Sequence, residues 1–484
     1  MDSVLVALDV GSSSARAALF DVHGEALADR FHQVPYEPRV TADGGVEHDP
    51  AVLLDAVTQC LDAVHASTAG MEVLGVGLTT FWHGLLGFDR DGRPVTPLSM
   101  WADTRAAPEV EILRAALDEP ALHARTGAHL HASYWPARLR WLAREHPALV
   151  ARVARWGSFG EQLESELFGE AATSVSMASG TGLFAQQACE WDAEALAAAG
   201  ITGAQLFPLV DRREPRRGLR RAWARRWPRF RTVAWFPAVG DGVASNVGSD
   251  CTDASRIALN VGTSAALRIV TPTPGAPVRG LWRYRIDRRV AIIGGATSEG
   301  GNVFAWCRDL LKLPDDNDAV ERALAEMPPD GHGLTVLPFL AGERAPGWRN
   351  GRTAVIAGLT LDVTPVEVLQ AAMEAVALRL AAVYAMLAPA AAPDHAVVAS
   401  GGGLARSPAW RRMIVDALGH PVHYSAETEA TSRGAALLAL EALGVLDGIA
   451  SPGRPLDAPL LPDPARQARY RAALERQRTL DERV

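Results

Sequence analysis

The sequence predicts an α/β protein built from two similar domains that face each other across a cleft. The main observation is a motif that occurs twice, at residues 7–13 (Ala-Leu-Asp-Val-Gly-Ser-Ser) and again at residues 258–264 (Ala-Leu-Asn-Val-Gly-Thr-Ser). The second observation is that short apolar runs alternate with longer stretches of helical spacing along both halves. The third is the length of 484 residues, which is enough for two or three domains of ordinary size.

Each copy of the motif consists of an apolar run, one polar residue, a glycine and two hydroxyl residues, and a second apolar run follows. This order predicts a β-hairpin with a tight turn. Glycine lets a ligand approach the backbone, and free N–H groups in a turn can bind phosphate oxygens. Two such turns would hold one polyphosphate from both sides; the alternative is a chance match between ordinary strand turns. Asp9 in the first copy can hold or orient a divalent metal ion, whereas Asn260 in the second is neutral.

The composition is that of a globular protein, with 48% hydrophobic and 21% charged residues. A formal net charge of −8 argues against a nucleic-acid partner and fits a soluble cytoplasmic enzyme. Lys312 is the only lysine, which argues against a phosphate-binding loop built around that residue. The four cysteines are far apart in the sequence, so we expect buried thiols and neither a zinc site nor disulfides.

No membrane segment is expected. The first apolar run has no basic region before it, so the sequence predicts no signal peptide. The longest apolar segment, residues 366–392, contains Glu367, Glu374 and Arg379, and it is better interpreted as a long core helix than as a membrane span.

The first half is expected to begin as a three-stranded meander, with its third strand over residues 26–32. A helix follows from Pro50, because Asp49 is a suitable N-cap and proline suits the first helical position. Residues 73–78 then predict a buried strand. The loop that follows, residues 79–84, would lie at the sheet edge where α/β proteins bind ligands.

The rest of the first half is less regular. Residues 136–168 are predicted to be mostly helical, and residues 171–182, which are small and hydroxyl-rich, a loop. Residues 211–231 hold ten arginines, and in an acidic chain we interpret them as a solvated helix face or surface turn rather than a nucleic-acid patch. A strand, the sequence Gly-Asp-Gly at 240–242 and a helix start then end the half.

The second half opens with the repeated hairpin and continues with strands near residues 288–296, 334–339 and 396–400. Thr364, Pro365 and Glu367 predict the capped start of a long helix. Ser407 is expected to cap a helix with Pro408 inside it, and a further helix runs from Thr431 to about Leu443. These elements give three segments, residues 1–246, 247–445 and a helical tail at 446–484.

Four loops at strand ends could carry the chemistry. Three of them suit phosphate or nucleotide because they are rich in glycine: residues 11–13, 262–264 and 401–403. The fourth contains Asp241 between two glycines, where a carboxylate could take a proton from an attacking hydroxyl. An ordinary turn aspartate is the alternative for Asp241 when it is considered alone.

Residues 9–16 resemble the first phosphate motif of the FGGY carbohydrate kinases, which belong to the sugar kinase, Hsp70 and actin superfamily. Residues 240–242 are similar to the catalytic-base motif of that family, and residues 260–264 resemble its second phosphate motif. Residues 342–348 are similar to a signature segment, and residues 400–403 to the adenosine motif. The resemblance implies two RNase H-like (actin-like ATPase) domains, with ATP and sugar in the cleft between them and closure on substrate.

The resemblance also implies roles for individual residues. Asp241 would be the catalytic base, and Asp9 would act with Mg²⁺. The phosphates and the adenine nucleotide would lie against a set of loop residues: Gly11, Ser12, Ser13, Arg16, Gly262, Thr263, Gly402, Gly403 and Arg406. Relatives can have a smaller polar residue in place of Arg406.

The substrate loop departs from the family pattern. Relatives often have Met-His where this chain has Trp82 and His83, so the resemblance leaves the sugar open. An indole suits stacking on a sugar, and core packing is the equal alternative for Trp82. His83 could donate to a substrate hydroxyl, with a structural histidine as the alternative.

Within the family, residues 101–105 and 294–302 look most like gluconate kinases. Asp103 could accept hydrogen bonds from sugar hydroxyls and Arg105 could face a carboxylate, although an Asp–Arg pair at this spacing is often a salt bridge that braces a loop. We therefore expect a cytoplasmic, ATP-dependent kinase of gluconate, with xylulose or another ketopentose or polyol second. A nucleotide-dependent binding or regulatory protein is the alternative of another class, and a homodimer is left open.

Overall fold

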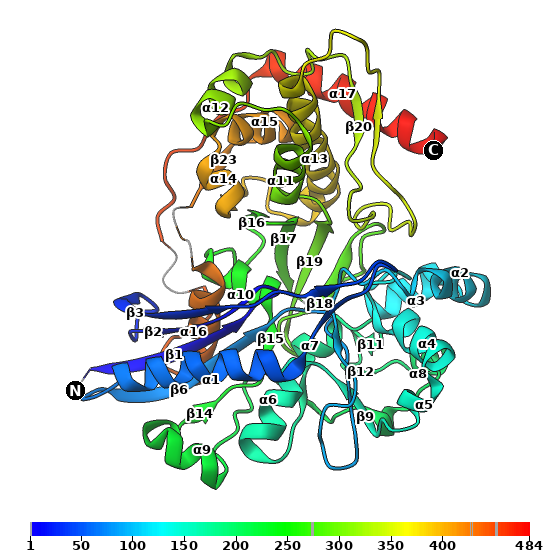
Figure 1. The fold of residues 1–484 in the computed structure, drawn as a ribbon. Coiled ribbons are helices and arrows are strands. Elements are labelled where there is room, and N and C mark those ends of the chain that lie inside the picture. Colours follow the sequence, from blue (N-terminus) through cyan, green and yellow to red (C-terminus); the bar gives the residue numbers. More distant parts are fainter. Residues whose placement is uncertain (1, 273–274, 426, 428, 451–453) are drawn as a thin grey trace.

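The computed structural model describes residues 2–272, 275–425, 427, 429–450 and 454–484. It has two α/β domains, one above the other in Figure 1, with β17, β18 and β19 reaching down from the upper domain toward the lower one. The two expected hairpins are both present, and each forms the centre of a six-stranded sheet.

The first half contains fifteen strands, most of them short: β1 (Ser3–Val10), β2 (Ser14–Phe20), β3 (Ala26–Pro35), β4 (Arg39–Val40), β5 (Val46–His48), β6 (Glu72–Thr80), β7 (Leu86–Phe88), β8 (Leu98–Ser99), β9 (Arg155–Gly157), β10 (Thr173–Ser174), β11 (Phe184–Ala185), β12 (Glu190–Trp191), β13 (Leu209–Val210), β14 (Ala234–Trp235) and β15 (Val239–Gly240). Its helices are α1 (Pro50–Ser67), α2 (Ala107–Ala116), α3 (Glu119–Thr126), α4 (Trp135–Glu145), α5 (Pro147–Val150), α6 (Phe159–Phe168), α7 (Val175–Ser179), α8 (Ala193–Ala199), α9 (Arg221–Arg226) and α10 (Asp241–Gly248).

The second half contains fewer and longer elements. Its strands are β16 (Arg256–Val261), β17 (Ala265–Pro272), β18 (Trp282–Arg285), β19 (Val290–Thr297), β20 (Thr335–Leu337), β21 (Val355–Ala357), β22 (Ala396–Ser400) and β23 (Val422–Tyr424). Its helices are α11 (Gly301–Leu310), α12 (Asn317–Glu326), α13 (Pro365–Leu387), α14 (Gly402–Arg406), α15 (Pro408–Leu418), α16 (Ala430–Ala442) and α17 (Pro464–Arg483).

The two large sheets repeat one topology. In the first, the order is β14-β6-β1-β2-β3, with β1, β2 and β3 antiparallel and β6 parallel to β1. In the second, the order is β18-β19-β17-β16-β22-β23, with β16, β17 and β19 antiparallel and β22 parallel to β16. On the parallel strand next to each hairpin, Asp9 is paired with Thr79 of β6 and Asn260 with Ser400 of β22. The two polar residues therefore occupy equivalent places in the two sheets.

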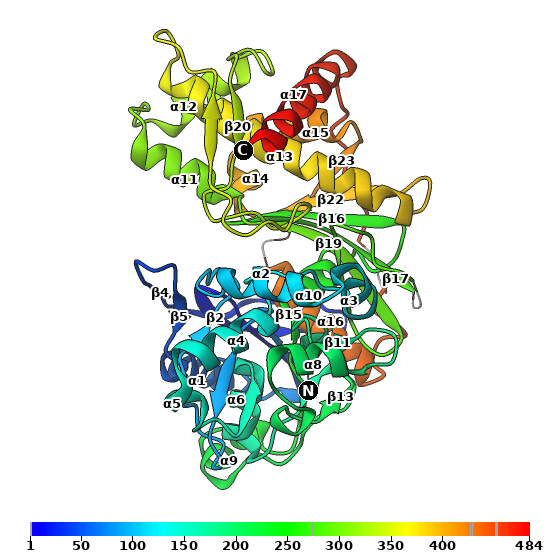
Figure 2. The ribbon, with the colours of Figure 1, turned by 90° about the vertical axis from the view of Figure 1, so that its right-hand side faces the viewer.

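Strand alternation gives each sheet two buried faces. On β1, Val4, Val6 and Leu8 belong to the main core, which also includes the buried face of α1, and Leu5 and Ala7 pack with residues of α16. In the second domain, α13 packs on β17 and β19, and α15 packs on α13. Figure 2 shows the sheet of this domain on the side toward the first domain, with α11, α13 and α17 beyond it.

Helix α16 crosses from the second half of the sequence to the first domain. It packs on α10, β1 and β6, and Figure 1 shows it among the strands of the lower domain. Contact is close enough that a Cβ atom at Gly434 would lie 1.8 Å from the carbonyl oxygen of Ala244. The two halves of the sequence are therefore interlocked at the base of the cleft.

The caps predicted for three helices are present. Asp49 accepts a hydrogen bond from the N–H of Ala51, Thr364 and Glu367 form a capping box, and Ser407 caps α15. Together with the turn that follows it, α13 is long and apolar enough to cross a membrane, but 78% of its most apolar window is buried in the protein. This agrees with the expectation of a core helix.

Two predictions for the first half need correction. Residues 171–182 are not a surface loop: they are buried and include β10 and α7, because their small side chains let the aromatic rings of Trp82 and Tyr134 pack closely against Gly180 and Gly182. The arginine-rich segment is only partly a solvated face. Arg212 is 2% exposed, and its guanidinium forms ion pairs with Asp287 and Glu441.

Candidate active site

A cavity between the domains contains three of the residues that the sequence singled out, Trp82, His83 and Asp241. Both domains contribute to its walls, which are mainly aromatic and carry a few charged and polar groups: Trp101, Ser133, Tyr134, Asn260, Ser264, Arg268, Trp282, Tyr284, Arg344 and Trp348. An enclosed cavity with aromatic walls and few polar groups is typical of a small-molecule site.

Asp241 lies where β15 ends and α10 begins. Its Oδ1 accepts a hydrogen bond from the N–H of Gly242 at 2.8 Å. Burial raises the pKa of Asp241 above its ordinary value, and the positive charge of Arg268 lowers it. A partly buried carboxylate with a raised pKa and a cavity in front of it has the properties of a general base.

The two glycines beside Asp241 make room for the indole of Trp82. A Cβ atom at Gly240 would lie 2.0 Å from Cε2 of Trp82, and one at Gly242 would lie 2.5 Å from Cζ3. The indole N–H donates to the carbonyl oxygen of Ser176 at 3.0 Å, which fixes the ring. Trp82 is therefore both a core residue and a wall of the cavity, and its ring fixes the backbone that carries Asp241.

His83 has a left-handed backbone conformation, with φ of 69°, which is uncommon for residues other than glycine and often marks a functional site. Its Nδ1 lies 2.7 Å from the carbonyl oxygen of Gly180, so this nitrogen carries the proton and donates. Burial and, second, the charge of Arg138 lower the pKa of His83 to about 3, so the ring is neutral. Its Nε2 can then only accept, which reverses the expectation of a donor to substrate.

The first hairpin turn is held from behind through its carbonyl groups. Tyr36 donates from its hydroxyl to Gly11 and from its N–H to Ser13, and Nε2 of His48 lies 3.0 Å from the carbonyl oxygen of Ser12. The side chains of Ser12 and Ser13 are exposed, and within the described residues their hydroxyls have no hydrogen-bond partner. The turn therefore presents free hydroxyls, as a phosphate-binding turn requires.

The second hairpin turn is supported in the same way. Gly301 donates from its N–H to the carbonyl oxygen of Gly262 at 2.7 Å, and Asn302 donates to Thr263 at 3.2 Å. A Cβ atom at Gly300 would lie 2.6 Å from the backbone of Ser264, so only glycine allows this contact. Thr263 is exposed, and α11 starts directly behind the turn.

The glycines at 401–403 lie beside the second hairpin. Gly401 has φ of 110°, and a Cβ atom there would lie 2.4 Å from the carbonyl oxygen of Val261. Gly402 is exposed and starts α14. Arg406 donates a hydrogen bond from Nε to the carbonyl oxygen of Gly402 at 3.1 Å. The structure thus brings the second hairpin turn, Gly402, Gly403 and Arg406 into one region.

The carboxylates near the first hairpin suit a divalent cation. Asp9 is 2% exposed, and its pKa is raised to about 7: burial raises it most, Arg16 lowers it, and the charges of Asp241 and Glu429 raise it. Arg16 pairs with Asp9 at 3.3 Å, and Oε2 of Glu429 is buried without a hydrogen-bond partner in the described part of the chain. Carboxylate oxygens are the donors that Mg²⁺ prefers.

Arg105 does not line the cavity. Its guanidinium forms ion pairs with both Asp103 and Glu47, and it lies over the ring of Trp141, with 4.4 Å from Cζ to the ring centroid. This is the arrangement expected of the alternative, a salt bridge that braces the loop. Asp103 lines a smaller neighbouring cavity, which shares Trp101, Ser133 and Arg344 with the main one.

Sequence patterns did not single out Arg268 or the aromatic residues Tyr134, Trp282 and Tyr284, and they placed Arg344 in the signature segment without a role. Arg268 interrupts an apolar strand, which is a signal that the sequence did contain. The hydroxyl groups of Tyr134 and Tyr284 meet at 2.5 Å across the domain boundary. Contacts of this kind join residues that are far apart in the chain, and no local pattern predicts them.

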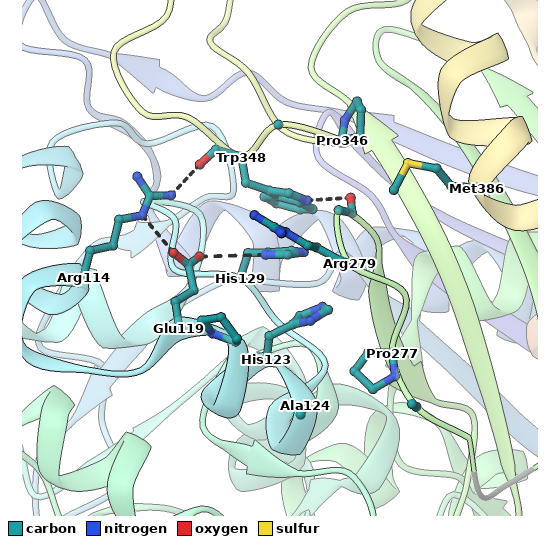
Figure 3. A pocket seen from close by; sticks show the side chains of 14 residues that line it. Arg114, Glu119, His123, Ala124, His129, Pro277, Arg279, Pro346, Trp348 and Met386 are labelled. Carbon is teal, nitrogen blue, oxygen red and sulfur yellow. Dashed lines mark hydrogen bonds and ion pairs between the residues drawn. The ribbon is translucent and has the colours of Figure 1, made fainter.

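A second, larger cavity lies near α3 and is shown in Figure 3. The rings of His123, His129 and Trp348 are stacked there, and Arg114 donates to the carbonyl oxygen of Trp348 at 2.7 Å. Trp348 lines both cavities. None of the residues predicted for catalysis or phosphate binding lines the larger one, so the smaller cavity is the candidate active site.

Comparison with known proteins gives consistent matches along the chain. Residues 4–248 match the N-terminal domain of the FGGY family of carbohydrate kinases, and residues 257–443 match its C-terminal domain. A gluconokinase of Bacillus subtilis (strain 168) is 27% identical over 92% of this chain and 89% of its own length. A glycerol kinase of Rhizorhabdus wittichii is 30% identical over 93% of this chain and 90% of its own length.

Solved structures agree on the fold. The gluconate kinase from Lactobacillus acidophilus has a TM-score of 0.91 and 24% identity, and it covers 100% of this chain and 98% of its own. A ligand-bound xylulose kinase from the same organism has a TM-score of 0.90 and 24% identity, with coverage of 99% and 98%. These likenesses confirm the predicted architecture of two actin-like ATPase domains.

Proposed function

Because this chain belongs to the FGGY family of carbohydrate kinases, we propose that it transfers the γ-phosphate of ATP to a hydroxyl of a small sugar acid, with D-gluconate as the first candidate. The family makes it a phosphotransferase with an alcohol group as acceptor. The observation that carries the proposal is the cavity between the domains, where a partly buried carboxylate, Asp241, shares the space with two guanidinium groups.

Asp241 is the proposed base. Its raised pKa suits proton transfer from a sugar hydroxyl, whose oxygen then attacks the γ-phosphorus while the β–γ bridging oxygen leaves with ADP. The proton goes to the Asp241 carboxylate and the phosphoryl group to the sugar oxygen. His83 supports the pose by accepting a hydrogen bond from a substrate hydroxyl at Nε2.

The two hairpins are the proposed phosphate sites. The exposed hydroxyls of Ser12, Ser13 and Thr263 face outward from turns whose carbonyl groups are already bound from behind. Gly402, Gly403 and Arg406 would lie along the adenine nucleotide, since they adjoin the second turn. We therefore assign the base and part of the sugar site to residues 1–246, and most nucleotide contacts to residues 247–445, which also line the sugar cavity.

Asp9 would hold Mg²⁺, with Glu429 close enough for its charge to act on the same site. The ion would neutralise charge on the phosphates during transfer. Arg16, which pairs with Asp9 here, would be free to contact a phosphate oxygen once a cation takes its place.

Xylulose or another ketopentose is the second candidate acceptor. The xylulose kinase and the gluconate kinase of Lactobacillus acidophilus have nearly equal TM-scores against this chain, so shape alone favours neither. The two guanidinium groups in the cavity favour an acid, because neither forms an ion pair with a described carboxylate and a neutral ketose would supply none.

The test is ADP release with Mg-ATP across a panel of gluconate, xylulose, ribulose, glycerol, erythritol and no sugar. We expect release that depends on gluconate and is lost in Asp241→Asn. Release with a ketopentose alone would replace gluconate by the second candidate. Equal release in every well, with ATP still bound, would overturn the kinase assignment in favour of a nucleotide-dependent binding protein.

A further inference from the structure

Arg268 is a charged residue in the middle of an apolar strand. On β17 its neighbours Leu267 and Ile269 are buried in the core of the second domain, and alternation turns Arg268 to the opposite face of the sheet. There its side chain lines the cavity that contains Asp241. The guanidinium also lies close to the backbone of α10, with Nε 2.9 Å from the place that a Cβ atom of Gly242 would occupy.

The guanidinium of Arg268 has no counter-ion in the described part of the chain. Its Nε and Nη1 are buried without a hydrogen-bond partner, and it forms no ion pair with any described carboxylate. Two buried arginines elsewhere have carboxylate partners: Arg212 pairs with Asp287 and Glu441, and Arg379 pairs with Glu343 and Asp481. A buried charge without a partner is costly, so this one is kept for a group that the protein itself does not supply.

Arg344 adds a second positive charge to the same cavity. It is 8% exposed, its Cζ lies 4.2 Å from the ring centroid of Trp101, and Nη2 donates to the carbonyl oxygen of Thr297 at 2.7 Å. Its Nε has no partner among the described residues. Burial lowers the pKa of Arg344, the charge of Glu299 raises it, and the charge of Arg268 lowers it. Two cations that face each other in a buried space favour an anion between them.

Asp241 is not that anion. No ion pair joins Asp241 to Arg268, although each feels the charge of the other. The two groups therefore lie near each other in the cavity without forming an ion pair. A substrate with a hydroxyl at one end and a carboxylate at the other fits this arrangement, with the hydroxyl at Asp241 and the carboxylate at the arginine.

We propose that Arg268 binds the carboxylate of the substrate through its guanidinium fork, with Arg344 as the second positive charge, and so selects sugar acids over neutral sugars. The planar fork of arginine matches the two oxygens of a carboxylate. This proposal rests on the proposed function and adds the group that sets its substrate class. It replaces Arg105, whose guanidinium is already held by Asp103 and Glu47.

Binding of gluconate without nucleotide is the direct test. Four tryptophans line the cavity, so intrinsic fluorescence reports occupancy: Trp82, Trp101, Trp282 and Trp348. The variants are Arg268→Gln, Arg268→Lys and a matched control, Arg283→Gln. Arg283 is also buried with nitrogen atoms that lack partners among the described residues, but on β18 it alternates with Trp282 and Tyr284 and does not line the cavity.

We expect Arg268→Gln to weaken gluconate binding about 100-fold, because a charge-assisted pair with a carboxylate is lost. Glucitol, the neutral polyol of the same length, should bind both proteins with Kd values within about threefold of each other, since no carboxylate contact is lost. Arg268→Lys should fall between, because lysine keeps the charge and loses the fork. Arg283→Gln should match the wild type.

Three results would overturn the proposal. The first is an unchanged affinity of Arg268→Gln for gluconate, and the second is an equal loss of affinity for gluconate and for glucitol. The third is a loss of affinity for ATP as large as the loss for gluconate, because that result would assign Arg268 to the phosphoryl group. The proposed function has its own outcome. If the wild type phosphorylates gluconate and Arg268→Gln does so equally well, only this proposal fails. If the wild type phosphorylates another sugar acid and Arg268→Gln loses it, only gluconate is wrong.

Discussion

The two hairpins have the same backbone and opposite surroundings. Each ends a β-strand of a repeated sheet, and each turn is held from behind through its carbonyl groups, by Tyr36 and His48 in one case and by the start of α11 in the other. The first is surrounded by acids, Asp9 and Asp241 among them, whereas the second is followed along its strand by Arg268.

The difference in charge between the two hairpins is clearest at the equivalent residues Asp9 and Asn260. Asp9 is buried beside Arg16, while Asn260 donates to the hydroxyl oxygen of Ser400 at 3.2 Å and carries no charge. The repeated topology alone would provide two equal phosphate turns. The difference in charge gives the cleft one side suited to a metal ion and a base, and another suited to an anionic substrate end and a nucleotide.

The largest expected effect comes from removing the base on the acidic side. Asp241→Asn should lower kcat by about 10³-fold, in the range that general-base catalysis supplies, and leave ATP affinity unchanged. Stopped-flow turnover and nucleotide titration measure the two quantities. Asp394→Asn, at an exposed carboxyl that does not line the cavity, is the control. Turnover at the wild-type rate in Asp241→Asn would remove its assigned role.

Asp9→Asn makes the two hairpins equal in charge. We expect the Mg²⁺ concentration for half-maximal rate to rise between about 10-fold and 100-fold, as is typical when a metal site loses a supporting group. The measurement is rate against free Mg²⁺ at fixed ATP. A Mg²⁺ dependence identical to that of the wild type would show that the metal does not depend on Asp9.

Asn260→Asp gives the second hairpin the charge of the first. Because a carboxylate near bound phosphates repels them, the apparent Kd of ATP should rise about 10-fold. Asn260→Ala serves as the comparison, since it loses only a hydrogen bond to Ser400 and should change the Kd much less. Equal effects in the two variants would mean that charge at this position is not decisive.

The pH dependence of kcat/KM tests the charges on both sides of the cleft. The pKa of Asp241 is raised above its ordinary value by burial, and the base must be deprotonated, so activity should be lost as pH falls through a pKa above 3.8. Arg268 lowers that pKa, so Arg268→Gln should move the acid limb to higher pH. An acid limb that moves to lower pH, or does not move, would contradict this placement of the two groups.

The smallest effect on catalysis is expected from Arg105→Gln, which lies outside the cavity. Removing the arginine leaves the buried carboxylate of Asp103 without its ion-pair partner and Glu47 with Arg39 alone, so stability should fall by about 3 kcal/mol in urea denaturation. Gluconate KM should stay close to the wild-type value. A large rise in KM without loss of stability would restore Arg105 as a carboxylate partner.

Local patterns predicted much of the fold and part of the site. The glycine and hydroxyl turns, the caps at Asp49 and Thr364 and the position of Asp241 at a strand end all follow from short stretches of sequence. Such features depend on backbone conformation and on neighbours in the chain, which a sequence displays directly.

Features that depend on distant contacts were not predicted. The helical spacing of residues 430–442 shows an apolar face, but not that this face packs on the sheet of the other domain. Residues 171–182 look like a loop because they are small, and they are small because aromatic rings lie against them. The role of Arg268 was not predicted because it lies within an apolar run, although one charged residue in a buried strand is a visible signal.

The most direct test of the account is a ³¹P NMR spectrum of the protein with Mg-ATP and gluconate, recorded as the reaction proceeds. We predict that a phosphomonoester resonance grows in step with ADP, that it is absent without gluconate, and that Asp241→Asn abolishes it. Growth of inorganic phosphate alone, or ADP without any phosphomonoester, would contradict phosphoryl transfer to the sugar acid.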